Sequence, residues 1–332
     1  MHRWRRPSRE RGGTATRDAG AIAGRNILRI GLGLFWLLDG VLQAQPAMFS
    51  PLFVQQVLQP AAQGQPSWLA SLLRTSAALW QQHAVAANLS AIFIQIAIGL
   101  LLLAGRDRPW GRVGLWLSIG WGLGIWVLGE GLGGLLTGAA TVLTGAPGSV
   151  LVYVVGAILL LLPARWWATG QVARWVRRAL GLFWLAMAAL QAWPPAGYWM
   201  GQQLGGVFAM AASLPQPAPL AAPIHAMAAL AAQSALVWNG LFVAIMVVLG
   251  LALLGRSTRR WAYGLMAVWL LLTWWLGQDF GGPFTGAATD PNTAPVLGLL
   301  LLAARRSPGE QRRLAALRWG RTLAAGVGVP VR

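Results

Sequence analysis

The chain has 332 residues, of which 56% are hydrophobic and 10% are charged, and its mean hydropathy is +0.56. Soluble domains carry roughly 25% charged residues, so this composition excludes a soluble globular protein. All 26 basic residues are arginines, the net charge is +18 and cysteine is absent, which excludes lysine Schiff-base chemistry, disulfides, iron–sulfur clusters and thiolate metal sites.

Long uncharged stretches between arginines predict helices that cross a membrane. A helix needs about 20 apolar residues to cross ~30 Å of hydrocarbon, and breaks at glycine, proline and polar clusters divide these stretches into eight segments. In chain order the segments are 27–45, 84–104, 113–129, 147–163, 177–194, 236–254, 261–278 and 292–304. The expected fold class is an all-α integral membrane protein with eight transmembrane helices.

The arginines support this division. With a cytoplasmic N-terminus, 25 of the 26 arginines fall on one face and only Arg74 lies outside, as the positive-inside rule requires. We therefore expect a multi-pass plasma-membrane protein with both termini cytoplasmic. Its partners would include anionic lipid headgroups, which attract each nearby arginine by about 1 kcal/mol. No nucleic-acid partner is expected, because the charge is spread over the turns between spans.

An internal repeat organises the chain. Leu32-Gly33-Leu34-Phe35-Trp36 recurs 148 residues later at 180–184, and Gly129–Thr141 aligns at the same offset with Gly277–Thr289. This predicts two parallel four-helix repeats, 27–165 and 166–305, which are called here the first and second halves. A disordered basic cytoplasmic arm, 1–26, would precede them, and a basic cytoplasmic tail, 306–332, would follow.

The repeated glycine-rich motifs lie on the external side, each before a short last span. Short interrupted hydrophobic segments at matching places in two repeats indicate a binding site in membrane proteins. The motifs contribute these candidate ligand-binding residues: Gly133, Gly134 and Thr137 in the first half, and Gln278, Asp279 and Thr285 in the second. The alternative is that the glycines only allow close helix packing.

Asp39 is an ionisable residue inside the first predicted span. It lies ten residues, or roughly 15 Å, from Arg29 at the cytoplasmic edge, and intramembrane ionisable residues are functional candidates by default. Gln43 lies one turn further along the same helix face, where the two side chains could hydrogen-bond. The second half keeps Gln191 but has Met187 in place of Asp39. The alternative is a neutral Asp39 that only holds helices together.

A second group of candidates lies at the external mouth. Glu130 ends the third span, and His83 and Arg74 precede the second, so the three could form a polar cluster. No metal site is expected, because the histidines lack ligand spacing. Trp36, deep in the first span, is either a core residue or a stacking partner for a quinone-like ring.

The repeated unit resembles the DoxX-like four-span membrane proteins, duplicated in tandem. The resemblance rests on its size, four spans, a first span beginning Arg29-Ile30-Gly31-Leu32-Gly33-Leu34-Phe35-Trp36, a long external loop and a glycine-rich motif after the third span. It covers about 27–165 and 176–305. Some members of that family are membrane subunits of thiosulfate:quinone oxidoreductases, so the resemblance implies a redox-associated subunit with a soluble or membrane oxidoreductase partner and a quinone as its possible cofactor.

Three function classes remain open at this level. The first is a quinone-linked redox subunit, the second a small-solute transporter or channel with its site at the external glycine-rich motifs, and the third a structural or assembly protein. The sequence assigns no catalytic residue, substrate or enzyme activity of the chain's own.

Overall fold

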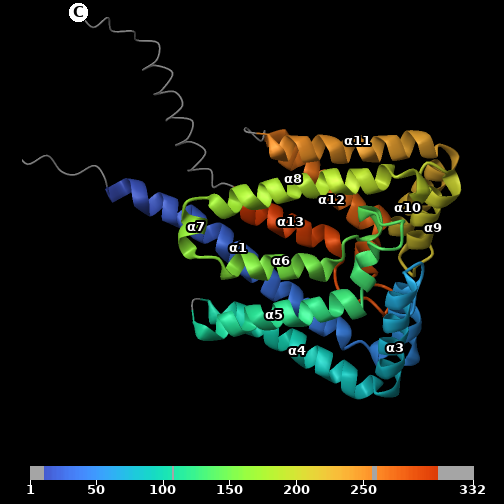
Figure 1. Cartoon of the computed structure of the whole chain (residues 1–332), viewed down its shortest axis with the longest axis horizontal. Coiled ribbons are helices and arrows are strands. Elements are labelled where there is room, and N and C mark those ends of the chain that lie inside the picture. Colours follow the sequence, from blue (N-terminus) through green and yellow to red (C-terminus); the bar gives the residue numbers. More distant parts are fainter. Residues whose placement is uncertain (1–10, 107, 256–259, 306–332) are drawn as a thin grey trace, which may run out of the picture.

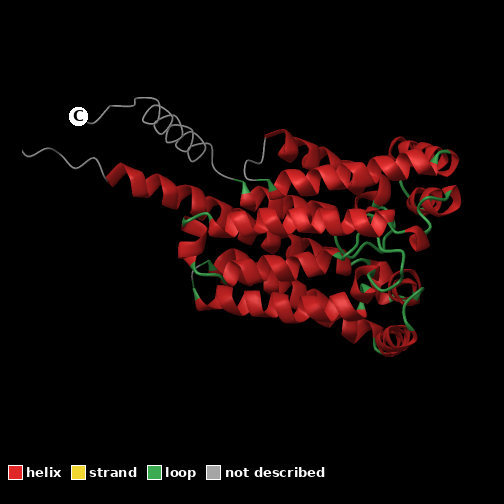
Figure 2. Cartoon of the chain, turned by 45° about the horizontal axis from the view of Figure 1, so that its top comes forward, coloured by secondary structure: helices red, strands yellow, loops and turns green. Residues whose placement is uncertain are grey.

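The computed structural model describes residues 11–106, 108–255 and 260–305. Within these ranges the secondary structure is entirely helical, which confirms the predicted all-α class (Figures 1 and 2). The main helices of the first half are α1 (Arg11–Gln43), α3 (Ser67–Gln82), α4 (Ala84–Gly105), α5 (Pro109–Leu128) and α6 (Ser149–Leu161). After the short α7 (Ala164–Ala168), the second half contains α8 (Gln171–Ala192), α9 (Gly201–Ala212), α10 (Ala218–Gln233), α11 (Ala235–Leu254), α12 (Arg260–Leu272) and α13 (Thr293–Ala304).

Four of the described helical segments are long and apolar enough to cross a membrane. They are Ala23–Gln43 within α1, together with α4, α5 and α11. A helix also lies at each of the other four predicted spans, but α6 and α13 have only 13 and 12 residues, which gives lengths of about 20 Å. The glycine-rich motifs precede these two short helices, as expected. The number of spans therefore stays a prediction.

The long helices run side by side, with α1 near the middle of the molecule (Figure 1). Helix α1 packs against α4, α6 and α13, while α8 packs against α11 and α13. Glycines bring the closest pairs together: a Cβ at Gly99 would lie 2.8 Å from the Gly33 carbonyl oxygen, and one at Gly250 would lie 2.9 Å from that of Gly181. The α1–α4 and α8–α11 pairs thus use the same kind of backbone contact.

Helices α3, α9 and α10 lie across one end of the long helices, whereas α7 lies at the opposite end (Figure 1). Helix α3 is amphipathic. It exposes Trp68, Leu72 and Leu79 while it buries Leu69 and Leu73. An apolar exposed face on a helix that crosses the bundle end is typical of a segment at a membrane interface.

Part of the N-terminal arm is helical and not disordered. Helix α1 begins at Arg11, so residues 11–26 of the arm that was expected to be disordered are helical. Residues 1–10 of the arm and the expected tail, 306–332, lie outside the described residues.

Candidate functional site

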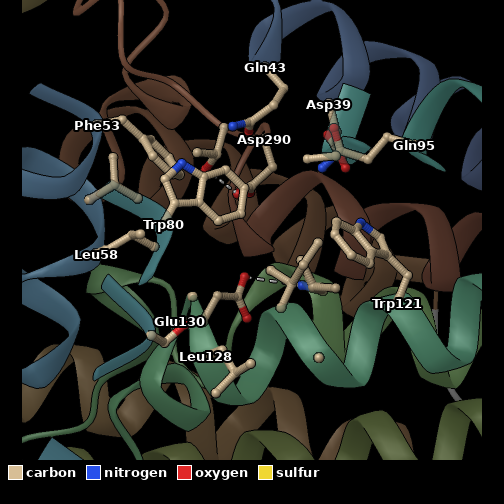
Figure 3. Close-up of a pocket in the computed structure, with 18 residues that line it drawn as sticks. Asp39, Gln43, Phe53, Leu58, Trp80, Gln95, Trp121, Leu128, Glu130 and Asp290 are labelled. Atoms are coloured by element: carbon tan, nitrogen blue, oxygen red, sulfur yellow. Dashed lines mark hydrogen bonds between the residues drawn. The ribbon is translucent and has the colours of Figure 1, made fainter. Parts of the chain in front are cut away.

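A cavity of about 260 Å³ lies mainly in the first half, near the ends of α1 and α5, and is called here the first-half cavity (Figure 3). Its walls are mostly apolar, with a few polar groups among them. The residues that line it are Asp39, Gln43, Phe53, Val57, Leu58, Ser76, Trp80, Ala91, Gln95, Trp121, Gly124, Ile125, Leu128, Gly129, Glu130, Val150, Thr289 and Asp290. A mostly apolar cavity with a few placed polar groups is the usual form of a small-molecule site.

Asp39 lies in the wall of this cavity and is only 2% exposed. Its Oδ1 accepts a hydrogen bond of 3.2 Å from the hydroxyl of Tyr153 on α6. Gln43 instead donates to the Asn88 side chain at 2.6 Å, and Asn88 donates back to the Gln43 carbonyl. The expected hydrogen bond between Asp39 and Gln43 is therefore replaced by two separate pairs, because α6 and α4 each present a better-placed polar side chain.

Glu130 lies just beyond α5 and also faces the cavity. Its Oε1 accepts hydrogen bonds from the Ser149 hydroxyl at 2.8 Å and from the Val150 amide at 3.3 Å, while Oε2 has no protein partner. Burial, together with the nearby charge of Asp290, raises the pKa of Glu130 from 4.5 to about 8. At neutral pH this carboxyl is therefore mostly protonated and can donate a hydrogen bond.

Three more polar atoms of cavity-lining residues are buried without a partner. They are the indole nitrogens Nε1 of Trp80 and Trp121 and the side-chain oxygen Oε1 of Gln95. Figure 3 shows the two indole rings on different sides of the cavity, Trp80 from α3 and Trp121 from α5. An unsatisfied buried donor or acceptor costs about 1–3 kcal/mol, so a ligand that completes these hydrogen bonds would be favoured.

The cavity is shared between the two halves. Thr289, the last residue of the glycine-rich motif of the second half, lines it, as does the next residue, Asp290. The Asp290 side chain accepts hydrogen bonds from the Asn292 amide at 2.7 Å and the Thr289 hydroxyl at 2.9 Å. Asp290 therefore stabilises the turn before α13 and also adds an acidic group to a cavity that lies mainly in the other half.

The end of the first glycine-rich motif, Thr141, and the next residue, Val142, form hydrogen bonds with the second half. Thr141 donates to Gln191 at 2.5 Å, and Gln278 donates to the Val142 carbonyl at 2.8 Å. Gln191 also donates to Asn239 at 2.7 Å. These buried hydrogen bonds tie each motif to the opposite half, so Gln191 and Gln278 have structural partners rather than an open cavity.

A second, more polar cavity of about 310 Å³ borders the first. It is lined by Glu130, Gly133, Gly134, Thr144, Gly145, Gly148, Ser149, Asp290 and Asn292. Glu130 and Asp290 line both cavities. Gly148 has a φ angle of +100°, which L-residues rarely adopt, and a Cβ there would lie 2.1 Å from Oε2 of Glu130, so a side chain at 148 would also displace this carboxyl.

The glycine-rich motif itself makes a left-handed turn. The φ angles of residues 131–134 are +55°, +58°, +61° and +71°, and Asp279–Gly282 repeat this conformation. L-residues adopt it at a cost of about 1–2 kcal/mol each, which Leu132, Asp279 and Phe280 must meet. The motif is therefore a strained turn in the wall of a cavity, not merely a helix-packing surface.

The remaining predicted residues lie elsewhere. Trp36 is fully buried, donates to Ser118 at 2.8 Å and meets Tyr153 edge-on, so it supports Tyr153 rather than lining the cavity. Arg74 and His83 are exposed, and neither is among the described residues that line the cavity, so the structure does not bring them to Glu130.

The candidates of the two motifs have local roles. Thr137 and Thr285 each accept from the amide two residues later and donate to a glycine carbonyl three residues earlier. Asp279 is 2% exposed, its Oδ2 has no partner, and burial raises its pKa to about 6.

Sequence reasoning missed several residues of the site. Gln95 and Tyr153 are polar side chains inside apolar helices, which is the signal that could have identified them. Trp80 resembles a membrane-interface anchor by position, whereas Trp121 lies in the middle of the predicted span 113–129 among apolar residues. Asp290 could not be placed in this site without knowing that the two halves exchange their loops.

Among the described residues, no group of three or more histidine, cysteine, aspartate or glutamate side chains could hold a metal ion. No protein-family model matches the chain, and no curated protein and no solved structure is significantly similar to it.

Proposed function

We propose that this chain is a membrane subunit that binds a quinone-like ring in the first-half cavity. The observation that carries the proposal is the pair of unpartnered indole N–H groups, Trp80 and Trp121, beside a mostly apolar cavity. Both need an acceptor, as does a protonated Glu130. A planar apolar ring with carbonyl oxygens offers such acceptors and stacks favourably on aromatic side chains.

The acidic residues around the cavity also disfavour an anionic ligand. None of the described residues that line it is basic, whereas three are acidic: Asp39, Glu130 and Asp290. An anionic ligand would therefore be repelled. The resemblance to DoxX-like subunits of quinone-linked oxidoreductases agrees with this ligand class.

When bound, a quinone would accept two electrons from a redox partner and two protons to become a quinol. The chain's own residues hold and position the ligand and carry protons at its edge. Glu130 holds a proton near pH 7 and lines both cavities, so it can exchange that proton with the polar cavity beside Asp290. Tyr153 fixes the Asp39 carboxyl through its hydrogen bond.

The experiment is a binding titration of the purified full-length chain in nanodiscs with a short-chain ubiquinone. Saturable quenching of tryptophan fluorescence is expected. The affinity obtained from the titration should fall in Trp80→Phe and Trp121→Phe, which keep an aromatic ring but lose the donor. Trp261→Phe, an exposed tryptophan on α12, is the matched control. Undiminished binding by both cavity variants would contradict the proposal.

We further propose eight spans in two parallel repeats, in the plasma membrane with both termini cytoplasmic. Recurring contacts support the repeats: Trp126 donates to the Pro147 carbonyl at 2.7 Å, and Trp274 donates to the Pro291 carbonyl at 2.7 Å. Reporter fusions after residues 108, 170, 258 and 310 should then be cytoplasmic, and those at 60, 140, 215 and 288 external. Inversion of one half relative to the other would refute this topology.

A small-solute transporter is the second candidate. The observation in its favour is that Glu130 and Asp290 join the polar cavity to the cavity that contains Asp39, which makes a continuous acidic region. Intramembrane carboxylates often mark ion or proton pathways. Uptake of protons or small cations by proteoliposomes, abolished in Asp39→Asn, would favour transport over quinone binding.

A further inference from the structure

We infer that the first-half cavity opens sideways into the lipid between α4 and α5, so that its ligand is a membrane-soluble molecule that arrives from the bilayer. This rests on the proposed function and narrows its ligand class. Such a ligand carries an apolar tail, which would remain in the opening while the ring occupies the cavity.

Helices α4 and α5 are in close contact at one end and line the cavity toward the other. A Cβ at Gly105 would lie 2.3 Å from the Gly111 nitrogen, and one at Gly114 would lie 2.8 Å from the Leu101 Cβ. Figure 1 shows α4 and α5 diverging from this end toward α3. Gln95 on α4 and Trp121 on α5 line the cavity further along.

The edge of α5 beside the cavity is built from small or exposed residues. A Cβ placed at Gly124, which lines the cavity, would meet no heavy atom within 4 Å, and the same holds for Gly120 one turn earlier. Leu128, one turn later, lines the cavity and is 38% exposed. This edge of α5 therefore lacks side chains at Gly120 and Gly124.

The opening lies at membrane depth. Gly124 is four residues, or about 6 Å, inside the end of α5 at Leu128, and α5 is among the helices apolar enough to span a membrane. What faces this edge in a bilayer is hydrocarbon, which admits an apolar tail and excludes a hydrated solute.

The second half has no such gap at the matching residues. At the offset of 148, Val268 replaces Gly120 and Leu272 replaces Gly124. Both side chains lie on the outside of α12, with exposures of 55% and 40%. The glycines are thus specific to the half that contains the acidic cavity.

The absence of cysteine allows a direct test by site-directed spin labelling. Single variants Gly124→Cys and Leu128→Cys carry a nitroxide on the full chain in nanodiscs. Gly264→Cys, where an added Cβ also meets nothing within 4 Å, is the lipid-facing control on α12. Thr144→Cys, exposed beside the polar cavity, is the aqueous control.

The lateral opening predicts that the labels at 124 and 128 relax more with oxygen, which concentrates in lipid, than with a water-soluble nickel chelate, as at 264. Greater relaxation by the nickel chelate would show an aqueous opening and overturn the inference. Relaxation by neither reagent would show an edge covered by protein, such as a second copy, and would overturn it as well.

Addition of a short-chain ubiquinone separates this inference from the proposed function. Oxygen accessibility at 124 should fall at least about twofold while that at 264 stays unchanged. If the quinone changes neither site but the label at 124 remains lipid-accessible, the lateral opening stands and the quinone proposal fails.

Discussion

The two halves of this chain share helix contacts but differ in the chemistry of their interiors. The Gln43–Asn88 pair in the first half has its counterpart in Gln191–Asn239, with similar hydrogen bonds in both. When these shared contacts are used to match positions, several polar residues of the first half correspond to apolar residues of the second. The matched pairs are Asp39 and Met187, Gln95 and Met246, Ser118 and Met266, and Tyr153 and Leu297, and all eight side chains are buried.

The matched pairs show that the helical framework does not need these polar groups. Methionine and leucine fill the same places in the second half, and a buried polar group without a partner is costly. Asp39 and Gln95 line one cavity and Tyr153 holds the Asp39 carboxyl, which supports the proposal that the functional site belongs to the first half. The second half contributes the supporting fold and the Asp290 turn.

The largest expected effect comes from removing the Asp39 carboxyl. Asp39→Asn should lower quinone affinity at least about tenfold, or about 1.4 kcal/mol, while membrane expression stays near normal, because asparagine has the same shape and can still accept from Tyr153. Met187→Leu is the matched change in the second half and should alter binding little. Equal, mild effects in the same titration would show that Asp39 only holds helices together.

The next effect concerns pH and Glu130. Because its pKa is about 8, the protonated donor is lost as pH rises through 8, and affinity should fall several-fold between pH 7 and 9. Glu130→Gln should remove this pH dependence, because an amide donates at every pH and Gln278 shows that glutamine fits the matching turn. Asp39 and Asp290 also line the cavity and could contribute to the pH dependence. The pH dependence of quinone affinity is therefore measured for Glu130→Gln and for Asp290→Asn in parallel.

The same group affects stability. The folded state holds the Glu130 proton more tightly than the unfolded chain does, so its contribution to stability is fully present below about pH 4.5 and is lost as pH rises toward 8. Thermal scans in detergent should show a decline across this window that is absent in Glu130→Gln. An unchanged decline in the variant would assign it to another group.

A smaller effect is expected from Asp290, which the second half contributes to the cavity beside Glu130. Asp290→Asn keeps the shape of the turn but removes a negative charge near Glu130, so the pKa of Glu130 and the midpoint of the affinity loss should shift to lower pH. Asp279→Asn, a similar change at the motif of the second half, should leave that midpoint in place. A shift in both variants would mean that Asp290 acts only through general charge.

The smallest effect is a difference in thermal stability between variants of two matched tryptophans, Trp36 and Trp184. Trp36 donates to Ser118, whereas the Nε1 atom of Trp184 is buried without a partner. Phenylalanine at either position loses ring volume, but only Trp36→Phe also breaks a hydrogen bond, which is worth about 1 kcal/mol. Trp36→Phe should therefore melt at a lower temperature than Trp184→Phe, and the reverse order would contradict the assigned packing.

Much of the helical framework followed from the sequence because apolar length and arginine positions determine where membrane helices begin and end. The site followed only in part. Asp39 and Glu130 were identifiable as charges in an apolar setting, and the structure places both in one cavity. The roles of Asp290 and Tyr153 depend on contacts between segments more than 100 residues apart in the chain, which periodicity and spacing do not encode.

We propose that the ligand binds in the first half and not at the matching place in the second. Photoaffinity labelling of the full chain in nanodiscs with an azido-quinone, followed by peptide mapping, distinguishes the two places. We expect labels on the segments around Trp80 and 121–130, displaced by excess short-chain ubiquinone and lost in Asp39→Asn. Displaceable labelling centred instead on Met187, Met246 and Trp269 of the second half would contradict it.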